Sequence, residues 1–373
     1  MIRHGAEVHV VLSQAASELV SAQALEWATG HPVLTRFSGR AEHIELCGQG
    51  GLCSLLLVAP ATANSLGKIA LGLDDTPVTT LATTAVGAGL PVLVAPGMHE
   101  PMLDNPFVQE NLGRLERAGV RIIHPHVTEG KAKMASAEVI LDSVLRALRP
   151  QSLKGRRVLL TAGPTREALD AVRVLTNPSS GRMGAELARE ARLRGAEVTM
   201  VYGPASHPPP NGVRVLSVSS SAEMAEAVRQ QLQKERYHAF LGVAAVSDYA
   251  PASPYAGKRP TSEGSITVEL VPTPKILDQV RNWQSELLVV GFKAETEPEK
   301  LLPAARERLK QARADLIVAN LVGHQGLGFE TPDNEVWLVE PTAEQHLPRQ
   351  SKTLLAAAIW DRLEELPWPS SAS

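Results

Sequence analysis

The chain has 373 residues, of which 44% are hydrophobic and 21% charged, and this composition is typical of a globular protein of about two domains. Its formal net charge of −3 disfavours a nucleic-acid binder that works through bulk positive charge. No apolar run approaches the ~18–20 residues of a membrane span, and no signal peptide is visible. The two cysteines do not make a disulfide framework, so we expect a cytoplasmic protein without membrane or nucleic-acid partners.

The chain opens in the middle of a pattern. Residues 1–6 have the pattern of a helix end, with Gly5 at the C-cap, and residues 7–12 (EVHVVL) predict a strand. A helix end that opens a domain suggests that a preceding strand and loop are missing. A helix is expected over residues 13–29.

Two continuous apolar runs follow, 55–59 (LLLVA) and 92–95 (VLVA). Such runs are typical of strands buried on both faces of a parallel sheet. Each ends in a polar, proline-containing loop, and loops at the carboxyl ends of parallel strands are where open α/β sheets bind ligands. Further helices are expected over 65–71, 106–118 and 137–148, and a strand over 120–123.

The best domain boundary is the polar segment 150–155 (PQSLKG). A second α/β pattern begins after it, so we expect one domain over 1–149 and another over 150–373. The expected strands of the second domain are 158–161, 197–201, 213–218, 239–244, 265–270, 287–292, 316–319 and 336–339, and its expected helices are 183–194, 222–233, 299–314 and 352–363.

The most informative stretch is 158–184. A short apolar strand ends in the turn AGPT (162–165), and the loop NPSSG (177–181) leads into a helix. Small residues at a helix start leave backbone N–H groups available, and the helix dipole favours phosphate there. Neither the Walker A nor the Rossmann glycine pattern is present. A nucleotide site and an ordinary strand–turn–helix unit are both compatible with these loops.

Three sets of residues together are similar to one known family. They are AGPTRE (162–167), the loop Asn-x-Ser-Ser-Gly-x-Met-Gly (177–184), and AAVSDY (244–249) followed by VPTPKIL (271–277). Nearly the whole chain resembles the bifunctional coenzyme A biosynthesis proteins, which join a phosphopantothenoylcysteine decarboxylase to a phosphopantothenate–cysteine ligase. The resemblance implies two parallel-sheet domains: a flavodoxin-like flavoprotein domain at the N-terminus and a Rossmann-like ligase domain at the C-terminus.

For the second domain, the resemblance implies ligation of cysteine to 4′-phosphopantothenate through an acyl-cytidylate made from CTP, with Mg²⁺ offsetting the triphosphate charge. It assigns the acyl intermediate to Asn177, although Asn before a helix also favours a simple N-cap. Lys258 is expected to neutralise developing phosphate charge, and Asp248 to position the nucleotide or a cation. The other CTP-binding positions that the resemblance implies are Gly242, Val243, Ala244, Pro274, Lys275, Ile276, Leu277, Phe292, Arg306 and Lys310.

For the first domain, the resemblance implies FMN-dependent decarboxylation of 4′-phosphopantothenoylcysteine to 4′-phosphopantetheine. His43 matches the catalytic histidine, a residue type that exchanges protons near neutral pH. The motif PGMH (96–99) replaces the Pro-x-Met-Asn of many bacterial members and resembles archaeal-type members. The positions expected to contact FMN or substrate are Ser13, Thr62, Asn64, Met98 and His99.

The first domain also departs from the family pattern. The opening strand and the glycine-rich loop that hold the flavin phosphate are absent, and EGKAKM (129–134) replaces the cysteine-bearing flap. Lys131 is a candidate stand-in for the missing proton donor, although an exposed loop lysine is the simpler interpretation. An alternative is therefore a ligase whose N-terminal half is a non-catalytic scaffold or binding subunit. A nicotinamide-dependent reductase is disfavoured by the missing glycine fingerprint. Because flavin sites in this family lie between subunits, a homo-oligomer is expected.

Overall fold

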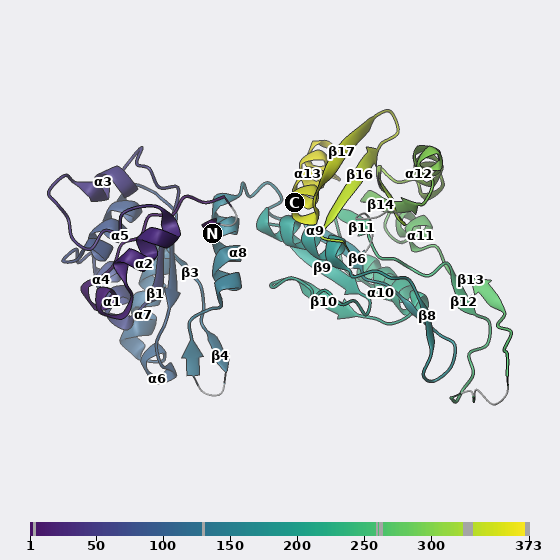
Figure 1. Cartoon of the computed structure of the whole chain (residues 1–373), viewed down its shortest axis with the longest axis horizontal. Coiled ribbons are helices and arrows are strands. Elements are labelled where there is room, and N and C mark those ends of the chain that lie inside the picture. Colours follow the sequence, from purple (N-terminus) through teal and green to yellow (C-terminus); the bar gives the residue numbers. More distant parts are fainter. Residues whose placement is uncertain (3–4, 129–130, 259, 261–263, 324–330, 370–373) are drawn as a thin grey trace. The chain divides into compact units, whose positions relative to one another are not determined.

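The computed structural model describes residues 1–2, 5–128, 131–258, 260, 264–323 and 331–369. The chain divides into two compact units, Met1–Arg149 and Pro150–Ser373. Each unit is built on parallel strands with helices packed against them, so the expected α/β class is confirmed (Figure 1). Among the described residues, no helix has both the length and the apolar character that crossing a bilayer requires.

The N-terminal unit contains short strands connected by helices. Its strands are β1 (Leu56–Ala61), β2 (Val92–Pro96), β3 (Arg121–Ile122), β4 (His126–Thr128) and β5 (Lys131–Lys133). Its helices are α1 (Gln14–Leu19), α2 (Ala22–Thr29), α3 (Glu42–Cys47), α4 (Ala63–Leu71), α5 (Pro77–Gly87), α6 (Glu100–Leu103), α7 (Pro106–Arg117) and α8 (Ala137–Leu148).

Strands β1, β2 and β3 form a parallel sheet in that order. The central strand β2 is buried at every residue, as its continuous apolar sequence predicts. Successive side chains of β2 pack into two different hydrophobic cores, because successive residues of a strand point to opposite faces of the sheet. Val92 and Val94 pack with α4, α5 and α7, whereas Leu93 and Ala95 pack with α8.

Two expectations for the first thirty residues are wrong. The predicted strand 7–12 is reduced to one bridge, in which Val11 pairs in parallel with Leu34. A strand needs a partner backbone along its length, and a local alternation of residues does not supply one. The single helix predicted over 13–29 is two helices, because Ser21 caps α2 by accepting a hydrogen bond from the Ala24 N–H at 3.4 Å.

The C-terminal unit has more and longer elements. Its strands are β6 (Arg157–Ala162), β7 (Arg166–Ala168), β8 (Val174–Thr176), β9 (Glu197–Tyr202), β10 (Arg214–Ser217), β11 (Ala239–Gly242), β12 (Tyr249–Pro251), β13 (Leu270–Pro272), β14 (Leu288–Glu295), β15 (Leu316–Leu321), β16 (Asp333–Val339) and β17 (Glu344–Ser351). Its helices are α9 (Arg182–Leu193), α10 (Ser221–Lys234), α11 (Ile276–Trp283), α12 (Pro298–Ala312) and α13 (Lys352–Glu365).

Eight of these strands form one sheet in the order β10-β9-β6-β11-β14-β15-β16-β17. The first six are parallel and follow the Rossmann-like order, so the chain reverses its direction of travel across the sheet between β6 and β11. The last two are antiparallel, and the sequence did not predict β17. Open α/β sheets bind ligands where such a reversal leaves a crevice at the carboxyl ends of the strands.

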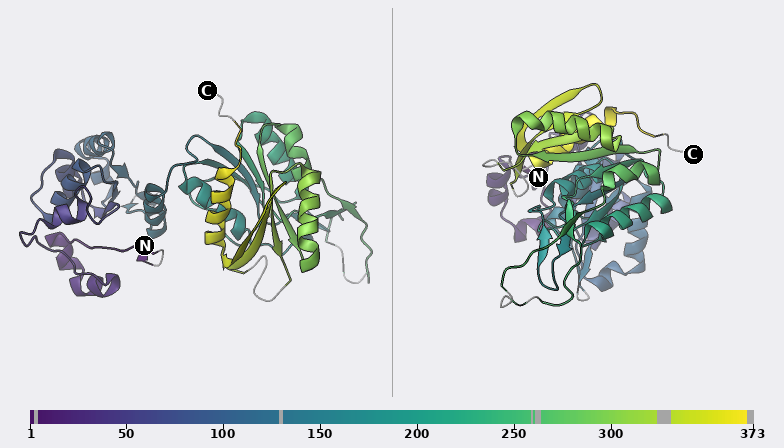
Figure 2. Two further views of the ribbon diagram at one scale, coloured as in Figure 1. Left: turned by 90° about the horizontal axis from the view of Figure 1, so that it is seen from above. Right: turned by 90° about the vertical axis from the view of Figure 1, so that its right-hand side faces the viewer.

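Helices cover both faces of this sheet, as Figure 2 shows for α13 and α12. Helices α9 and α13 share one core with the sheet, and α10, α11 and α12 share the other. Trp360 of α13 is fully buried in the first core, and its indole N–H donates to the Leu187 carbonyl of α9 at 2.9 Å. This bond ties α13 to α9 within one layer of helices.

Two short hairpins lie outside the main sheet. Strands β7 and β8 pair with each other, and β12 pairs with β13 from Tyr249–Pro272 to Pro251–Leu270. The predicted edge strand 265–270 is therefore wrong except at Leu270, because β12 offers a ladder only three residues long.

Candidate functional site

The loop before α9 has the geometry of an anion site. Gly181 is the N-cap of α9 with φ 76°, and as a glycine it has no side chain to cap the helix. The hydroxyls of Ser179 and Ser180 accept from the N–H groups of Gly181 and Arg182, each at 3.4 Å. A Cβ at Gly181 would lie 2.7 Å from the Tyr202 hydroxyl, so glycine is required there by space as well as by φ.

A second glycine sets the distance between α9 and the sheet. A Cβ at Gly184 would lie 2.3 Å from the Cβ of Ala162, at the end of β6. This contact draws the first turn of α9 close to the carboxyl end of β6, and the loop that precedes the helix therefore lies at the reversal of the sheet.

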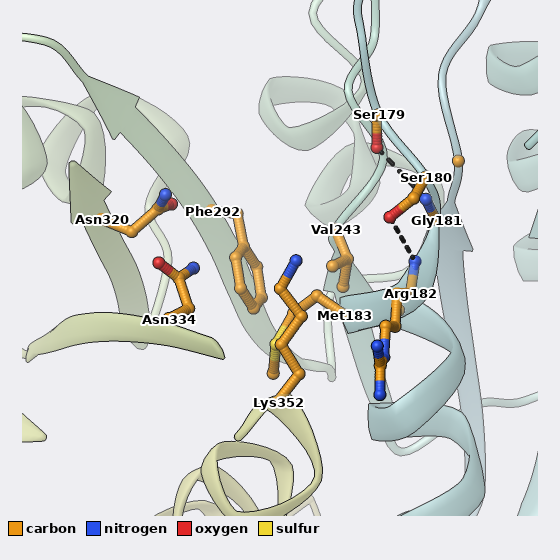
Figure 3. Close-up of a pocket in the computed structure, with 12 residues that line it drawn as sticks. Ser179, Ser180, Gly181, Arg182, Met183, Val243, Phe292, Asn320, Asn334 and Lys352 are labelled. Atoms are coloured by element: carbon orange, nitrogen blue, oxygen red, sulfur yellow. Dashed lines mark hydrogen bonds between the residues drawn. The ribbon is translucent and has the colours of Figure 1, made fainter. Parts of the chain in front are cut away.

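A pocket of about 450 Å³, counted to its open mouth, lies beside this loop (Figure 3). Val243 after β11 and Phe292 of β14 contribute apolar side chains to its wall. Lys352 reaches into it between the two asparagines and the serine–glycine loop (Figure 3). The complete lining is Gly163, Ser179, Ser180, Gly181, Arg182, Met183, Gly184, Val243, Phe292, Asn320, Asn334 and Lys352.

The pocket offers a ligand one buried cation and one hydrogen-bond acceptor that no described residue uses. The Lys352 side chain is almost fully buried, and burial, reinforced by the nearby Arg182, lowers the pKa of its amine to about 8. The Oδ1 atom of Asn334 is buried and has no hydrogen-bond partner among the described residues. Because a buried polar atom without a partner is costly, this asparagine is suited to a ligand that carries a donor.

Sequence analysis missed three of these pocket residues. Asn320 is the fifth residue of β15, Asn334 lies on β16 and Lys352 is the first residue of α13. The one available signal was Asn320, a polar residue at the end of an apolar parallel strand. Nothing local marks Asn334 or Lys352, because strand pairing brings them to the pocket from distant parts of the sequence.

Asn177 is not the helix N-cap, which is Gly181. Its side-chain amide donates to the carbonyls of Ala245 and Val246, at 3.2 and 3.3 Å. The loop 177–181 is thereby joined to the AAVSDY segment that follows β11. Since both amide hydrogens are used, Asn177 offers a ligand its Oδ1 acceptor.

Four of the twelve residues expected at the CTP site lie on or directly after two neighbouring strands. Gly242 ends β11, with Val243 and Ala244 directly after it, and Phe292 lies on the adjacent β14. Asp248 and Lys275 form an ion pair, which joins the segment after β11 to the start of α11. Pro274 lies next to Lys275 in that connection, whereas the side chains of Ile276 and Leu277 are buried in the core.

The three cations expected to face the phosphates are exposed and are not part of the pocket lining. Arg306 and Lys310 both lie on α12, where Arg306 forms an ion pair with Glu344 at 2.8 Å. Lys258 lies in the connection between β12 and β13.

In the N-terminal unit, the loops after β1 and β2 meet. The Gly97 N–H donates to the Ala61 carbonyl at 3.0 Å, and a Cβ at Gly97 would lie 2.9 Å from Pro60. Since the two strands are parallel, Thr62 and Asn64 lie at the same sheet edge as Met98 and His99. These positions suit a ligand laid across the carboxyl ends of the strands.

The remaining expected flavin contact, Ser13, and the expected catalytic residue, His43, lie at the start of one helix and on another. Ser13 caps α1, and its hydroxyl accepts from the Ala16 N–H at 3.2 Å. His43 of α3 is half-buried beside Phe37, with 5.4 Å between the ring centroids. Its Nδ1 atom is buried without a hydrogen-bond partner among the described residues, so it can bond to a bound group. Within the suggested flap, residues 129–130 lie outside the described residues and Lys131 begins β5.

Comparisons with known proteins identify the families of both parts of the chain. The profile of the family described as DNA/pantothenate metabolism flavoprotein C-terminal domain matches residues 153–366, and that of the family described as Flavoprotein matches residues 1–149. A coenzyme A biosynthesis bifunctional protein CoaBC from Thermococcus kodakarensis is 45% identical over 371 residues, which cover 98% of this chain and 90% of that protein. The protein of the same name from Escherichia coli is 34% identical over 377 residues, covering 96% and 90%.

A solved structure extends the likeness to the fold. The DNA/pantothenate metabolism flavoprotein from Streptococcus pneumoniae is 24% identical, with a TM-score of 0.50, over 56% of this chain and 99% of that one.

Proposed function

The chain belongs to the family of coenzyme A biosynthesis bifunctional proteins, and from that premise we propose that it converts 4′-phosphopantothenate into 4′-phosphopantetheine in two steps. Residues 150–373 join cysteine to 4′-phosphopantothenate at the expense of CTP. Residues 1–149 then decarboxylate the 4′-phosphopantothenoylcysteine that is formed, with FMN as cofactor. We place the protein in the cytoplasm, as a homo-oligomer.

The observation that carries the ligase assignment is the pocket beside α9. It combines a helix start flanked by the hydroxyls of Ser179 and Ser180, the buried amine of Lys352, and the Asn334 Oδ1, which has no partner among the described residues. Donors and a cation at one end suit the phosphate of 4′-phosphopantothenate. Asn177 at the loop entrance is then available to the rest of the pantothenate chain.

In the first step, the substrate carboxylate attacks the α-phosphate of CTP and expels pyrophosphate, and the cysteine amine displaces CMP from the acyl-cytidylate. The residues that end or follow β11, namely Gly242, Val243 and Ala244, would hold the nucleotide together with Phe292 of β14. Lys258, Arg306 and Lys310 are the exposed cations available to the triphosphate, and Mg²⁺ would share that charge. Asp248 is the candidate carboxylate for the cation, and it would exchange its ion pair with Lys275 for that role.

In the second step, FMN supplies the oxidation of the cysteinyl thiol that makes loss of CO₂ easy. The half-buried His43 would hold or move a proton through its unpartnered Nδ1. Thr62, Asn64 and Met98 would line the flavin edge, and His99 is placed to bond or pair with the substrate carboxylate. The matches to relatives run through both halves of the chain, which favours this bifunctional activity over a ligase with a scaffold domain.

The test uses the full chain and separates the two steps. Mixing CTP, Mg²⁺, cysteine and 4′-phosphopantothenate should release pyrophosphate, and replacement of CTP by ATP tests the nucleotide choice. Added FMN should be retained on gel filtration, and CO₂ should be released from supplied 4′-phosphopantothenoylcysteine. A chain that makes no pyrophosphate overturns the ligase assignment, and one that ligates but neither retains flavin nor releases CO₂ supports the scaffold alternative.

A further inference from the structure

Glu7, His9 and His31 form a compact cluster in the N-terminal unit that neither proposed activity uses. The Oε1 atom of Glu7 lies 3.1 Å from the Nε2 of His9 and 3.3 Å from the Nε2 of His31. All three ligand atoms lie within 4.8 Å of one another. The imidazoles are tilted against each other with 4.4 Å between ring centroids. Both rings therefore direct Nε2 toward one carboxylate oxygen.

The backbone holds these side chains in place from two separate segments. The Leu12 N–H donates to the Leu34 carbonyl at 2.9 Å, and the Leu34 N–H donates to the Val10 carbonyl at 3.0 Å. Glu7 and His9 are two residues apart, so an extended backbone places them on one face. His31 follows Gly30, the left-handed C-cap of α2, and its N–H donates to the Thr29 hydroxyl at 3.3 Å.

The geometry and the donor set match a tetrahedral metal ion. Zinc binds imidazole nitrogen and carboxylate oxygen at about 2.0–2.2 Å, which places neighbouring ligands of a tetrahedron about 3.3 Å apart. The contacts of Glu7 with His9 and His31, at 3.1 and 3.3 Å, are close to this length. Two imidazoles and one carboxylate favour zinc or a similar transition metal over Mg²⁺ or Ca²⁺, which prefer oxygen ligands alone.

We propose that Glu7, His9 and His31 bind one Zn²⁺ ion, which joins residues 7–12 to residues 31–34. Water completes the coordination, because the carboxylate is largely exposed while the two histidines are about one-quarter to one-third exposed. The ion replaces a single backbone bridge as the main link between the two segments. This role is structural and independent of the ligase and decarboxylase reactions.

The test is titration of the full chain, prepared without a polyhistidine tag, with Zn²⁺ in calorimetry. We expect one ion per chain. Loss of a group that merely supports a metal ligand weakens binding about 10- to 100-fold, so His9→Ala and His31→Ala, which each remove a ligand, should weaken it by at least that much. Saturating Zn²⁺ should raise the melting temperature of the wild type and leave unchanged that of the double variant, which carries both His9→Ala and His31→Ala. Mg²⁺ should not compete with Zn²⁺ for the site. His9→Gln and His31→Gln keep the side-chain volume, so they serve if an alanine variant fails to fold.

The matched control is His346→Ala. His346 also contacts a carboxylate, at 2.6 Å from Glu335, but within the described part of the chain this pair belongs to no cluster of three metal-ligating groups. This variant should bind Zn²⁺ like the wild type. Binding that survives in the double histidine variant, or no binding by the wild type, would overturn the proposal. Co²⁺ in place of Zn²⁺ gives a further check, because Cys53 lies close enough to His9 and Glu7 to interact with their charges. A cobalt–thiolate absorption band that disappears in Cys53→Ser would also overturn the proposal, because it would assign the ion to that thiol.

Discussion

The two units support their candidate sites in different ways. In the C-terminal unit, Asn334 and Lys352 line a pocket and are almost fully buried. In the N-terminal unit, Thr62, Asn64 and His99 lie exposed at the edge of a smaller sheet. The comparison indicates that the pocket of the C-terminal unit is preorganised, with its polar side chains already held in place. The exposed side chains of the N-terminal site would be fixed only when flavin and substrate bind. Preorganised groups lose little entropy on binding, and exposed ones lose more.

The largest expected effect is a loss of stability when the core beneath α9 and α13 is disrupted. Trp360→Ala removes a fully buried indole and its hydrogen bond to Leu187, and we expect the free energy of unfolding of the C-terminal unit to fall by about 3–5 kcal/mol. The matched control is Trp27→Ala in the N-terminal unit. Trp27 is 89% exposed, so its loss should change stability by about 0.5 kcal/mol or less. Urea unfolding measures both, and equal losses would contradict the contrast between the units.

The next effect separates the two reactions. Asn177→Ala should slow pyrophosphate release about 100- to 1,000-fold, by analogy with the loss of one positioned polar group at a reacting centre. CO₂ release from supplied 4′-phosphopantothenoylcysteine should be unchanged. His43→Asn should give the opposite pattern, with ligation intact and decarboxylation impaired. Full ligase turnover by Asn177→Ala would remove this residue from the proposed mechanism.

A pH effect is expected from Lys352. Its folded-state pKa of about 8 lies below the ordinary 10.5, so between these values the unfolded chain holds the proton more often and stability rises with pH. Anion binding changes in the opposite direction, because the ammonium loses its charge. We expect the affinity for 4′-phosphopantothenate to fall roughly fivefold to tenfold between about pH 7 and 9.5, measured by calorimetry. Lys352→Gln should bind more weakly at pH 7 and show little further loss, and a wild type without this decline would refute the assignment.

The smallest expected effect concerns the exposed cations. Glu344→Gln releases Arg306 from its ion pair, and the stability should change by about 1 kcal/mol or less because the pair is exposed. If Arg306 contacts the triphosphate, the same change should lower the KM for CTP by up to about fivefold. Arg229, which pairs with Glu226 on α10, provides the control, and Glu226→Gln should leave the KM unchanged. An identical KM in both variants would argue that Arg306 has no role at the nucleotide.

The sequence predicted the parts of the fold that depend on local pattern. The runs that became β2, β6 and β11 are mainly apolar, and burial on both faces demands that pattern. The loop 177–181 was also found, because its residue types are those of a helix start. Residues 7–12 and 265–270 misled because alternation occurs there without a partner strand long enough to pair with.

The residues of the candidate site likewise fall into those that the sequence predicted and those that it did not. Val243 and Phe292 were expected and line the pocket. Lys352 and Asn334 were not expected, since their place depends on the antiparallel strands that extend the sheet beyond β15. The roles of Lys258, Arg306 and Lys310 stay predictions, because exposed side chains depend on a ligand to define their contacts.

The contact between Gly184 and Ala162 has a consequence for mutational libraries. One close approach both docks α9 on β6 and sets the edge of the pocket. Any side chain at position 184 must push the helix outward and deform the binding loop with it. A library at this position should therefore lack variants that are fully stable but inactive. Across its variants, ligase activity and stability should fall together. The side chain of Asn177 bonds to two carbonyls and supports no hydrophobic core. Variants at position 177 should therefore fold normally and still lose ligase turnover.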